Sequence, residues 1–150
     1  PFWMTKSIYI ICTGIALIVV LIFKKYLVRL NNTWFIFDTF GLAFFTVAGI
    51  QKSLMYGFPF WVAIIMGCIT GAAGGIVRDV LINEIPLIFR KEIYALASIA
   101  GGLLFLLLSI VGVSDAICAI VCFLIVVLVR VLAVKYHISL PHLKAEDLER

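Results

Sequence analysis

Five apolar stretches joined by short connections dominate this sequence and restrict the environment in which it can fold. A helix needs roughly 20 apolar residues to cross the ~30 Å hydrocarbon core of a bilayer. Hydrophobic residues make up 65% of the chain, charged residues 13%, and the mean hydropathy is +1.22, whereas soluble domains are only about half apolar. The sequence therefore predicts an all-α membrane protein with spans at about 7–23, 34–55, 59–82, 92–112 and 115–136.

The basic residues alternate along the chain as a multi-spanning topology requires. The connections around Gly57 and Gly112 contain no Lys or Arg, whereas the other connections and the tail are basic. Because cytoplasmic loops are enriched in Lys and Arg, we expect the basic side and the C-terminus to be cytoplasmic. This topology accounts for the net charge of +4, so nucleic acid is not an expected partner. The residues that mark the basic side are Lys24, Lys25, Arg29, Arg90, Lys91, Lys135, Lys144 and Arg150.

Neither a cofactor nor an enzymatic activity is expected. The four cysteines lie inside apolar spans, where we interpret them as small hydrophobic side chains rather than disulfide partners. Cys118 and Cys122 are four residues apart, but no His or carboxylate stands at ligand spacing beside them, so no metal site is predicted. His137 and His142 lie in the polar tail without a partnering nucleophile.

Two stretches of the chain show weak internal similarity. PFWMTKSIYI, from Pro1, and PLIFRKEIYA, from Pro86, share Pro, Lys, Ile and Tyr at matching positions, the last being Tyr9 and Tyr94. Three spans separate the copies, so a true repeat would be inverted in the membrane, as in many transporters and channels. Alternatively, proline followed by an aromatic residue is simply a common start for a membrane helix. A true repeat predicts two further spans ahead of Pro1.

The third span contains small residues beside a cation and an anion, in GAAGGIVRD from Gly71. Gly67, Gly71, Gly74 and Arg78 are spaced by four, three and four residues, which would place them on one helical face. Such a face permits close helix packing, a purely structural role. The adjacent pair Gly74–Gly75 is also a potential kink site. We expect a kink there, with freed carbonyl groups that could coordinate a cation.

Charged residues inside the spans are the other candidates. Arg78 and Asp79 follow the glycines, and Asp38 enters the second span at a similar depth, so Asp38 is the expected partner of Arg78. This pair would be either a lock between helices or part of a permeation route. Lys52 lies near four turns after Asp38, so we expect the two to share a face with Phe45 and Gly49. Lys52 would either face the route or extend to the outer interface.

Two further charged residues have simpler interpretations. Arg130 lies near the end of the last span and is expected to extend its charge toward the interface. Asp115 precedes the same span, where we expect it to cap the helix.

These residues resemble the bacterial trimeric intracellular cation channel (TRIC) family, whose domain is also known as a glycine transporter domain. The similarity runs from Phe37 to Pro141, through DTFGLAFFTVAGIQKS, GCITGAAGGIVRDVLINEIPLIFRKEIYA and VRVLAVKYHISLP. It implies a seven-helix bundle in the bacterial inner membrane, built of two inverted three-helix repeats plus one helix. Residues 1–33 would hold the third helix, 34–112 the second repeat with a glycine-kinked helix 59–82, 113–136 the seventh helix, and 137–150 a cytoplasmic tail.

The resemblance also implies a homotrimer with a separate pore in each subunit, lined partly by the kinked fifth helix and approached by Lys52. We therefore expect a monovalent cation channel, chiefly for potassium, with membrane lipid and copies of the chain as partners. A small-solute carrier, for example for glycine, and a purely structural membrane protein are the alternatives. The residues expected along the route are Asp38, Lys52, Thr70, Gly71, Gly74, Gly75, Arg78 and Asp79.

Overall fold

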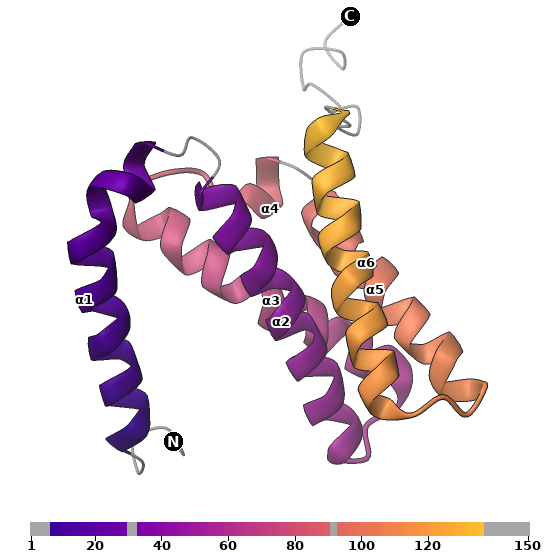
Figure 1. Cartoon of the computed structure of the whole chain (residues 1–150). Coiled ribbons are helices and arrows are strands. Elements are labelled where there is room, and N and C mark those ends of the chain that lie inside the picture. The colour runs from indigo at the N-terminus through magenta and orange to yellow at the C-terminus, as the bar shows by residue number, and fades with distance from the viewer. Residues whose placement is uncertain (1–6, 30–32, 91–92, 137–150) are drawn as a thin grey trace, which may run out of the picture. The chain divides into compact units, whose positions relative to one another are not determined.

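The computed structural model describes residues 7–29, 33–90 and 93–136, and within them it is entirely helical apart from short connections. Five of the helices are long, and the fourth is a single turn (Figure 1). The predicted all-α class is confirmed. The helices are α1 (Ser7–Arg29), α2 (Thr33–Met55), α3 (Phe60–Leu81), α4 (Leu87–Arg90), α5 (Ile93–Ile110) and α6 (Asp115–Lys135).

The bounds of the long helices follow the predicted spans closely. Helices α2, α3, α5 and α6 begin and end within two residues of the expected stretches. Helix α1 continues past its apolar part to Arg29, because the Lys and Arg residues that follow are good helix formers. Among the described residues, α3, α5 and α6 are long and apolar enough to cross a membrane. The crossing of α1 and α2 stays a prediction.

The chain divides into two compact units, 1–37 and 38–150. The first contains α1 and the start of α2, and the second contains the rest of α2 together with α3 to α6. Residues 1–6, which make up six of the ten residues of the first copy of the proposed repeat, lie outside the described residues, as does the tail 137–150. All charged residues that form the candidate site belong to the second unit.

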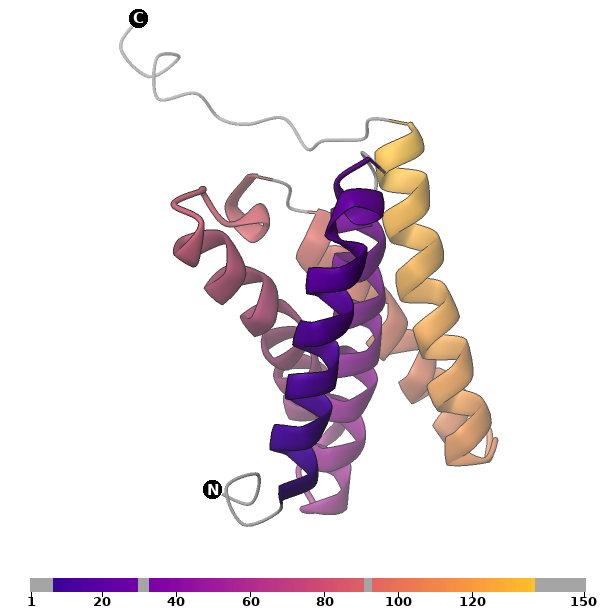
Figure 2. The same ribbon diagram turned by 60° about the vertical axis from the view of Figure 1, so that its left-hand side comes forward.

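Within the second unit, the turns that leave α2 and α5 lie at the same end (Figures 1 and 2). Each turn contains a glycine with positive φ, Gly57 at 78° and Gly112 at 84°, a conformation that costs glycine little. These are the two connections that contain no Lys or Arg, so the predicted segregation of charge matches the arrangement of the helices. Ser114 takes the N-cap position of α6, which makes Asp115 the first helical residue rather than the cap.

Glycines allow the backbones of α2 and α3 to pack in direct contact. A Cβ atom added to Gly67 would lie 2.8 Å from the carbonyl oxygen of Thr46, and one added to Gly71 would lie 2.9 Å from that of Leu42. From the opposite side, a Cβ atom on Gly49 would lie 2.8 Å from the Cα atom of Gly67. Small side chains at both helices are therefore required for this packing, as the sequence predicted for Gly67 and Gly71.

Replacing Gly67 by Ala is expected to destabilise the bundle by about 1–3 kcal/mol, the usual cost of overpacking. The new methyl group would meet a backbone carbonyl of α2, which cannot move aside as the end of a side chain can. The thermal unfolding midpoint of the detergent-solubilised protein measures the effect. Gly74→Ala is the matched control, because beyond the local backbone of α3 no heavy atom of the described residues lies within 4 Å of a Cβ atom there. Equal midpoints for the two variants would contradict the packing described.

Helices α5 and α6 pack equally closely. A Cβ atom on Gly101 would lie 2.5 Å from Cγ2 of Val126 and 3.1 Å from the carbonyl oxygen of Cys122. Cys118 and Cys122 are fully buried in this interface, where they serve as small apolar side chains. The inward-facing residues of α6 follow one another at steps of four, in the order Cys118, Cys122, Val126 and Arg130.

Candidate functional site

Helix α3 runs without interruption through its glycine pair. Every residue from Phe60 to Leu81 is α-helical, so the helix is not interrupted to free carbonyl groups at Gly74–Gly75, and a bend of its axis at this pair stays a prediction. An unsatisfied backbone group in an apolar environment costs several kcal/mol, whereas a glycine weakens a helix by only about 1 kcal/mol relative to Ala. The helix therefore keeps its hydrogen bonds and tolerates the glycines.

The small and charged residues of α3 divide into two neighbouring rows instead of sharing one face. We call the first the packed row: Gly67, Gly71, Gly75 and Asp79, at steps of four. A Cβ atom on Gly75 would lie 2.7 Å from the hydroxyl oxygen of Tyr94, so a side chain from α5 fills the space beside this glycine. A step of three residues, from Gly71 to Gly74, rotates the next glycine away from this row. The predicted single face is therefore corrected.

The second row, which we call the open row, consists of Thr70, Gly74 and Arg78. No described heavy atom comes within 4 Å of a Cβ atom at Gly74, and the side chain of Arg78 is 26% exposed. The hydroxyl group of Thr70 donates a hydrogen bond to the carbonyl oxygen of Met66 at 2.6 Å. The same hydroxyl oxygen would lie 3.0 Å from a Cβ atom at Gly49, so Thr70 lies at the contact with α2, and the open part of the row consists of the unfilled position at Gly74 and the guanidinium group of Arg78.

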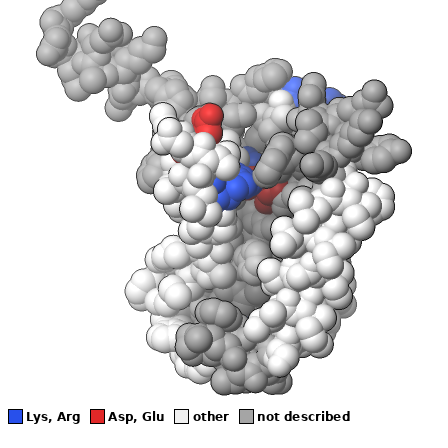
Figure 3. Space-filling model, turned by 90° about the vertical axis from the view of Figure 1, so that its left-hand side faces the viewer, with Lys and Arg blue, Asp and Glu red and all other residues white. Residues whose placement is uncertain are grey.

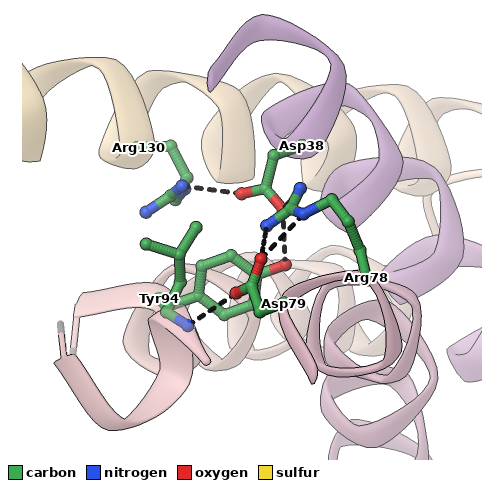
Figure 4. A network of polar contacts seen from close by, with 6 residues as sticks. Asp38, Arg78, Asp79, Tyr94 and Arg130 are labelled. Carbon is green, nitrogen blue, oxygen red and sulfur yellow. Dashed lines mark hydrogen bonds and ion pairs between the residues drawn. The ribbon is translucent and has the colours of Figure 1, made fainter. Parts of the chain in front are cut away.

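Asp38 is the centre of a buried polar network (Figure 4). Its Oδ1 atom accepts hydrogen bonds from Nη1 of Arg78 at 2.8 Å and from the hydroxyl group of Tyr94 at 3.2 Å. Its Oδ2 atom accepts one from Nη2 of Arg130 at 2.9 Å. The donors come from α3, α5 and α6, so one carboxylate on α2 joins four helices. The ion pair predicted between Asp38 and Arg78 is confirmed.

Arg130 does not extend toward the interface, and that prediction is wrong. Its side chain is only 3% exposed, and its guanidinium carbon lies 4.6 Å from the centre of the Tyr94 ring. The sequence held a signal for this placement that was missed. Arg130 continues the row of Cys118, Cys122 and Val126 at steps of four, which places it on the inward side of α6.

Asp79 joins the end of α3 to the connection that follows. One of its oxygens, Oδ1, accepts hydrogen bonds from Nε of Arg78 at 2.8 Å and lies 2.7 Å from Nη2 of the same residue. The other oxygen accepts a hydrogen bond at 2.9 Å from the backbone N–H of Leu87, the first residue of α4. Asp79 therefore binds both the neighbouring guanidinium group and the start of the next helix.

The charges of the network balance. Two guanidinium groups face two carboxylates, and three of these four side chains are no more than 7% exposed. Buried charges are tolerated when they are paired and hydrogen-bonded in this way. In the space-filling view, the charged atoms of the described residues gather toward one end of the face drawn (Figure 3). The site can therefore join helices and set a local electrostatic potential, and it holds no nucleophile–base pair.

The structure does not bring Lys52 into the network. It lies in the last turn of α2, exposed, with its Nζ atom 5.1 Å from the centre of the Tyr56 ring. Asp38 and Gly49 are buried, whereas Phe45 is exposed, so the expected continuous stripe is wrong. Packed helices cross at an angle. Residues at regular spacing along α2 therefore contact a neighbouring helix at one point and turn away from it further along.

Comparison with known proteins places this geometry among membrane proteins. Residues 35–110 match a family described as Glycine transporter. The chain is 37% identical over 145 residues to a UPF0126 membrane protein of Vibrio cholerae, covering 93% of this chain and 59% of the relative. It is 37% identical over 110 residues to the UPF0126 inner membrane protein YadS of Escherichia coli, covering 71% of this chain and 52% of that one. The chain thus spans little more than half the length of these curated relatives.

Solved structures of TRIC cation channels share the fold. A prokaryotic TRIC channel in 0.5 M KCl is 31% identical, with a TM-score of 0.79 over 93% of this chain and 71% of that one. A TRIC trimeric intracellular cation channel orthologue from Rhodobacter sphaeroides is 30% identical, with a TM-score of 0.75 over 91% of this chain and 71% of the other. A third match, from work on conductance through TRIC cation channels, is 30% identical and has a TM-score of 0.78.

Proposed function

Because the chain belongs to the Glycine transporter family of UPF0126 membrane proteins and has the fold of TRIC channels, we propose that it forms a membrane channel for monovalent cations, chiefly potassium. The observation that carries this proposal is the structural match to TRIC cation channels. It covers 96% of this chain at a TM-score of 0.78, with 30% sequence identity. The likeness therefore extends over nearly all of the helices described here.

The open row of α3 supports the choice of route. Its helix is long and apolar enough to cross a membrane, and polar groups within such a helix usually mark a pathway or a partner. We place Thr70, Gly74 and Arg78 along the route. Asp38, Asp79, Gly71 and Gly75 hold α3 from its packed side, and Lys52 lies at the opposite end of α2 from the network.

The assembly and the orientation are part of the same proposal. A relative of this fold is described as a trimeric channel, which supports a homotrimer with one route in each subunit and seven helices in the complete protein. YadS is described as an inner membrane protein, which supports the same location here. The basic connections then face the cytoplasm, as does the charged network, and lipid surrounds the assembly.

A carrier for a small solute such as glycine is the second candidate, because the matching family is described as Glycine transporter. Alternating access in such a carrier would require one group of helices to move against another around the solute site. A channel has no such requirement.

Recordings from the purified full-length protein in planar bilayers test the proposal. Discrete unitary current steps in potassium salt are expected. Saturable uptake of labelled glycine into proteoliposomes, without unitary currents, would overturn the channel and favour the carrier. The absence of both activities in a folded protein would overturn both candidates and leave the small residues of α3 with a packing role alone.

A further inference from the structure

We propose that Asp79 masks the charge of Arg78, so that the partly exposed guanidinium group does not repel cations at the inner end of the route. The inference rests on the proposed function, because it names the residue that protects the cation preference of a channel. Asp38 lies beside Arg78 as well, but it shares its negative charge with a second guanidinium group, that of Arg130.

The hydrogen bonds of Arg78 show that all three of its guanidinium nitrogens face carboxylate oxygens. Nε and Nη2 lie 2.8 Å and 2.7 Å from Oδ1 of Asp79, and Nη1 lies 2.8 Å from Oδ1 of Asp38. The side chain of Arg78 is 26% exposed, against 7% for Asp79 and 3% for Asp38. The cation therefore reaches outward, and the anions lie behind it.

The two carboxylates differ in their partners, because a second guanidinium group, that of Arg130, also binds Asp38. Arg130 binds the other oxygen of Asp38 at 2.9 Å, and both side chains are 3% exposed. This buried pair is neutral by itself. The two guanidinium groups therefore share Asp38, and the cluster of two cations and two anions is neutral only while Asp79 carries its charge.

The exposed edge of Arg78 lies on the open row, one helical turn after Gly74. A Cβ atom at Gly74 would find no described heavy atom within 4 Å, so this side of α3 is free of packing in the second unit. An unmasked positive charge beside a cation route raises the energy of each passing cation, and charged side chains at such places set the ion preference of channels. Masking by Asp79 removes that barrier.

Asp79→Asn is the decisive variant. The amide keeps a carbonyl oxygen for hydrogen bonding but loses the charge, so Arg78 becomes a net cation at the route. In planar bilayers with a KCl gradient, we expect the potassium-to-chloride permeability ratio to fall by about fivefold, as a unit charge at close range in a hydrated path implies. The reversal potential should shift toward that of chloride.

Charge compensation separates masking from a structural effect. The double variant Asp79→Asn/Arg78→Gln removes both charges and should restore the permeability ratio, although it restores no ion pair. Asp115→Asn, the same acid-to-amide change at the first residue of α6, is the matched control and should leave the ratio unchanged.

The inference would be overturned if Asp79→Asn conducts with an unaltered ratio, or if the double variant keeps the reduced ratio. Should Asp79→Asn fail to fold, Arg78→Gln alone decides: loss of the masked cation should raise the cation preference or leave it unchanged, and a decrease would overturn the proposal. Failure of the unsubstituted protein to pass any current would count against the channel itself, and is distinct from these outcomes.

Discussion

Replacing Asp38 by Ala is expected to lower the free energy of unfolding by about 3–5 kcal/mol, the usual cost of removing one partner from a buried ion pair. The substitution takes an acceptor from Arg78, Tyr94 and Arg130 together. Arg78 keeps Asp79, but the buried Arg130 side chain loses its carboxylate. The thermal unfolding midpoint of the detergent-solubilised protein, or its yield as a folded oligomer, measures the loss.

A compensating substitution tests the cause. In the double variant Asp38→Ala/Arg130→Met, the guanidinium group that suffers most from the loss of Asp38 is replaced by an apolar side chain, so stability should be partly regained. Asp115→Ala removes a carboxylate from an exposed position and should change the midpoint little. A normal midpoint for Asp38→Ala would show that the network does not hold the four helices together.

The second large effect is expected from Gly74→Leu, which should abolish unitary currents without unfolding the protein. Within the described part of the chain, no heavy atom beyond the local backbone of α3 stands within 4 Å of a Cβ atom at this position, so the first atom of the new side chain meets no neighbour. If ions pass the open row, an isobutyl group there would fill the route with apolar atoms and remove its water. Bilayer recordings and the unfolding midpoint should be measured on the same preparation.

Gly71→Leu is the matched comparison, since the same change is made three residues earlier on the same helix. A Cβ atom at Gly71 would lie 2.6 Å from the hydroxyl oxygen of Thr46 and 2.9 Å from the carbonyl oxygen of Leu42, so this variant should lose stability. Normal currents in folded Gly74→Leu would show that the route does not pass the open row. The glycines of α3 would then serve helix packing only.

The helix bounds could be predicted because the thickness of the bilayer core sets the length of a membrane-spanning helix. A bilayer core of about 30 Å requires helices of roughly 20 apolar residues, and the short connections leave little freedom between them. The Asp38–Arg78 pair could be predicted for a related reason: an ion inside a span needs an opposite charge at the same depth, and the alternation of spans gives the depth of each residue.

Two parts of the site escaped prediction for reasons of geometry. Arg130 lies close enough to the end of its span for its charge to reach water, so its depth alone did not decide between the interface and the interior. Its position in the row of buried residues on α6 places it in the interior. At Gly74 and Gly75, a rotation of about 100° per residue separates an open position from a packed one. Composition shows that both residues are small, but only the neighbouring helices show which one is in contact.

The glycine pair also shows the limit of reasoning from residue type. A pair of glycines weakens a helix locally but does not interrupt it, because the cost of an unmade hydrogen bond in an apolar medium favours a continuous helix. Tyr94 could be recognised from the sequence as part of the possible repeat and of the family motif, but nothing near the start of its span indicates a hydrogen bond to Asp38.

Asp38 binds guanidinium groups from two different helices, and this limits which helices can be exchanged between homologous proteins. Helix α6 contributes Arg130, and its partner Asp38 lies on α2, far away in the sequence. A chimera that takes its last helix from a homologue without an arginine at this position would inherit an imbalance of charge in its interior. Such chimeras should fold only when both proteins have an aspartate at the position of Asp38 and an arginine at that of Arg130. Helix α6 therefore cannot be exchanged independently of α2.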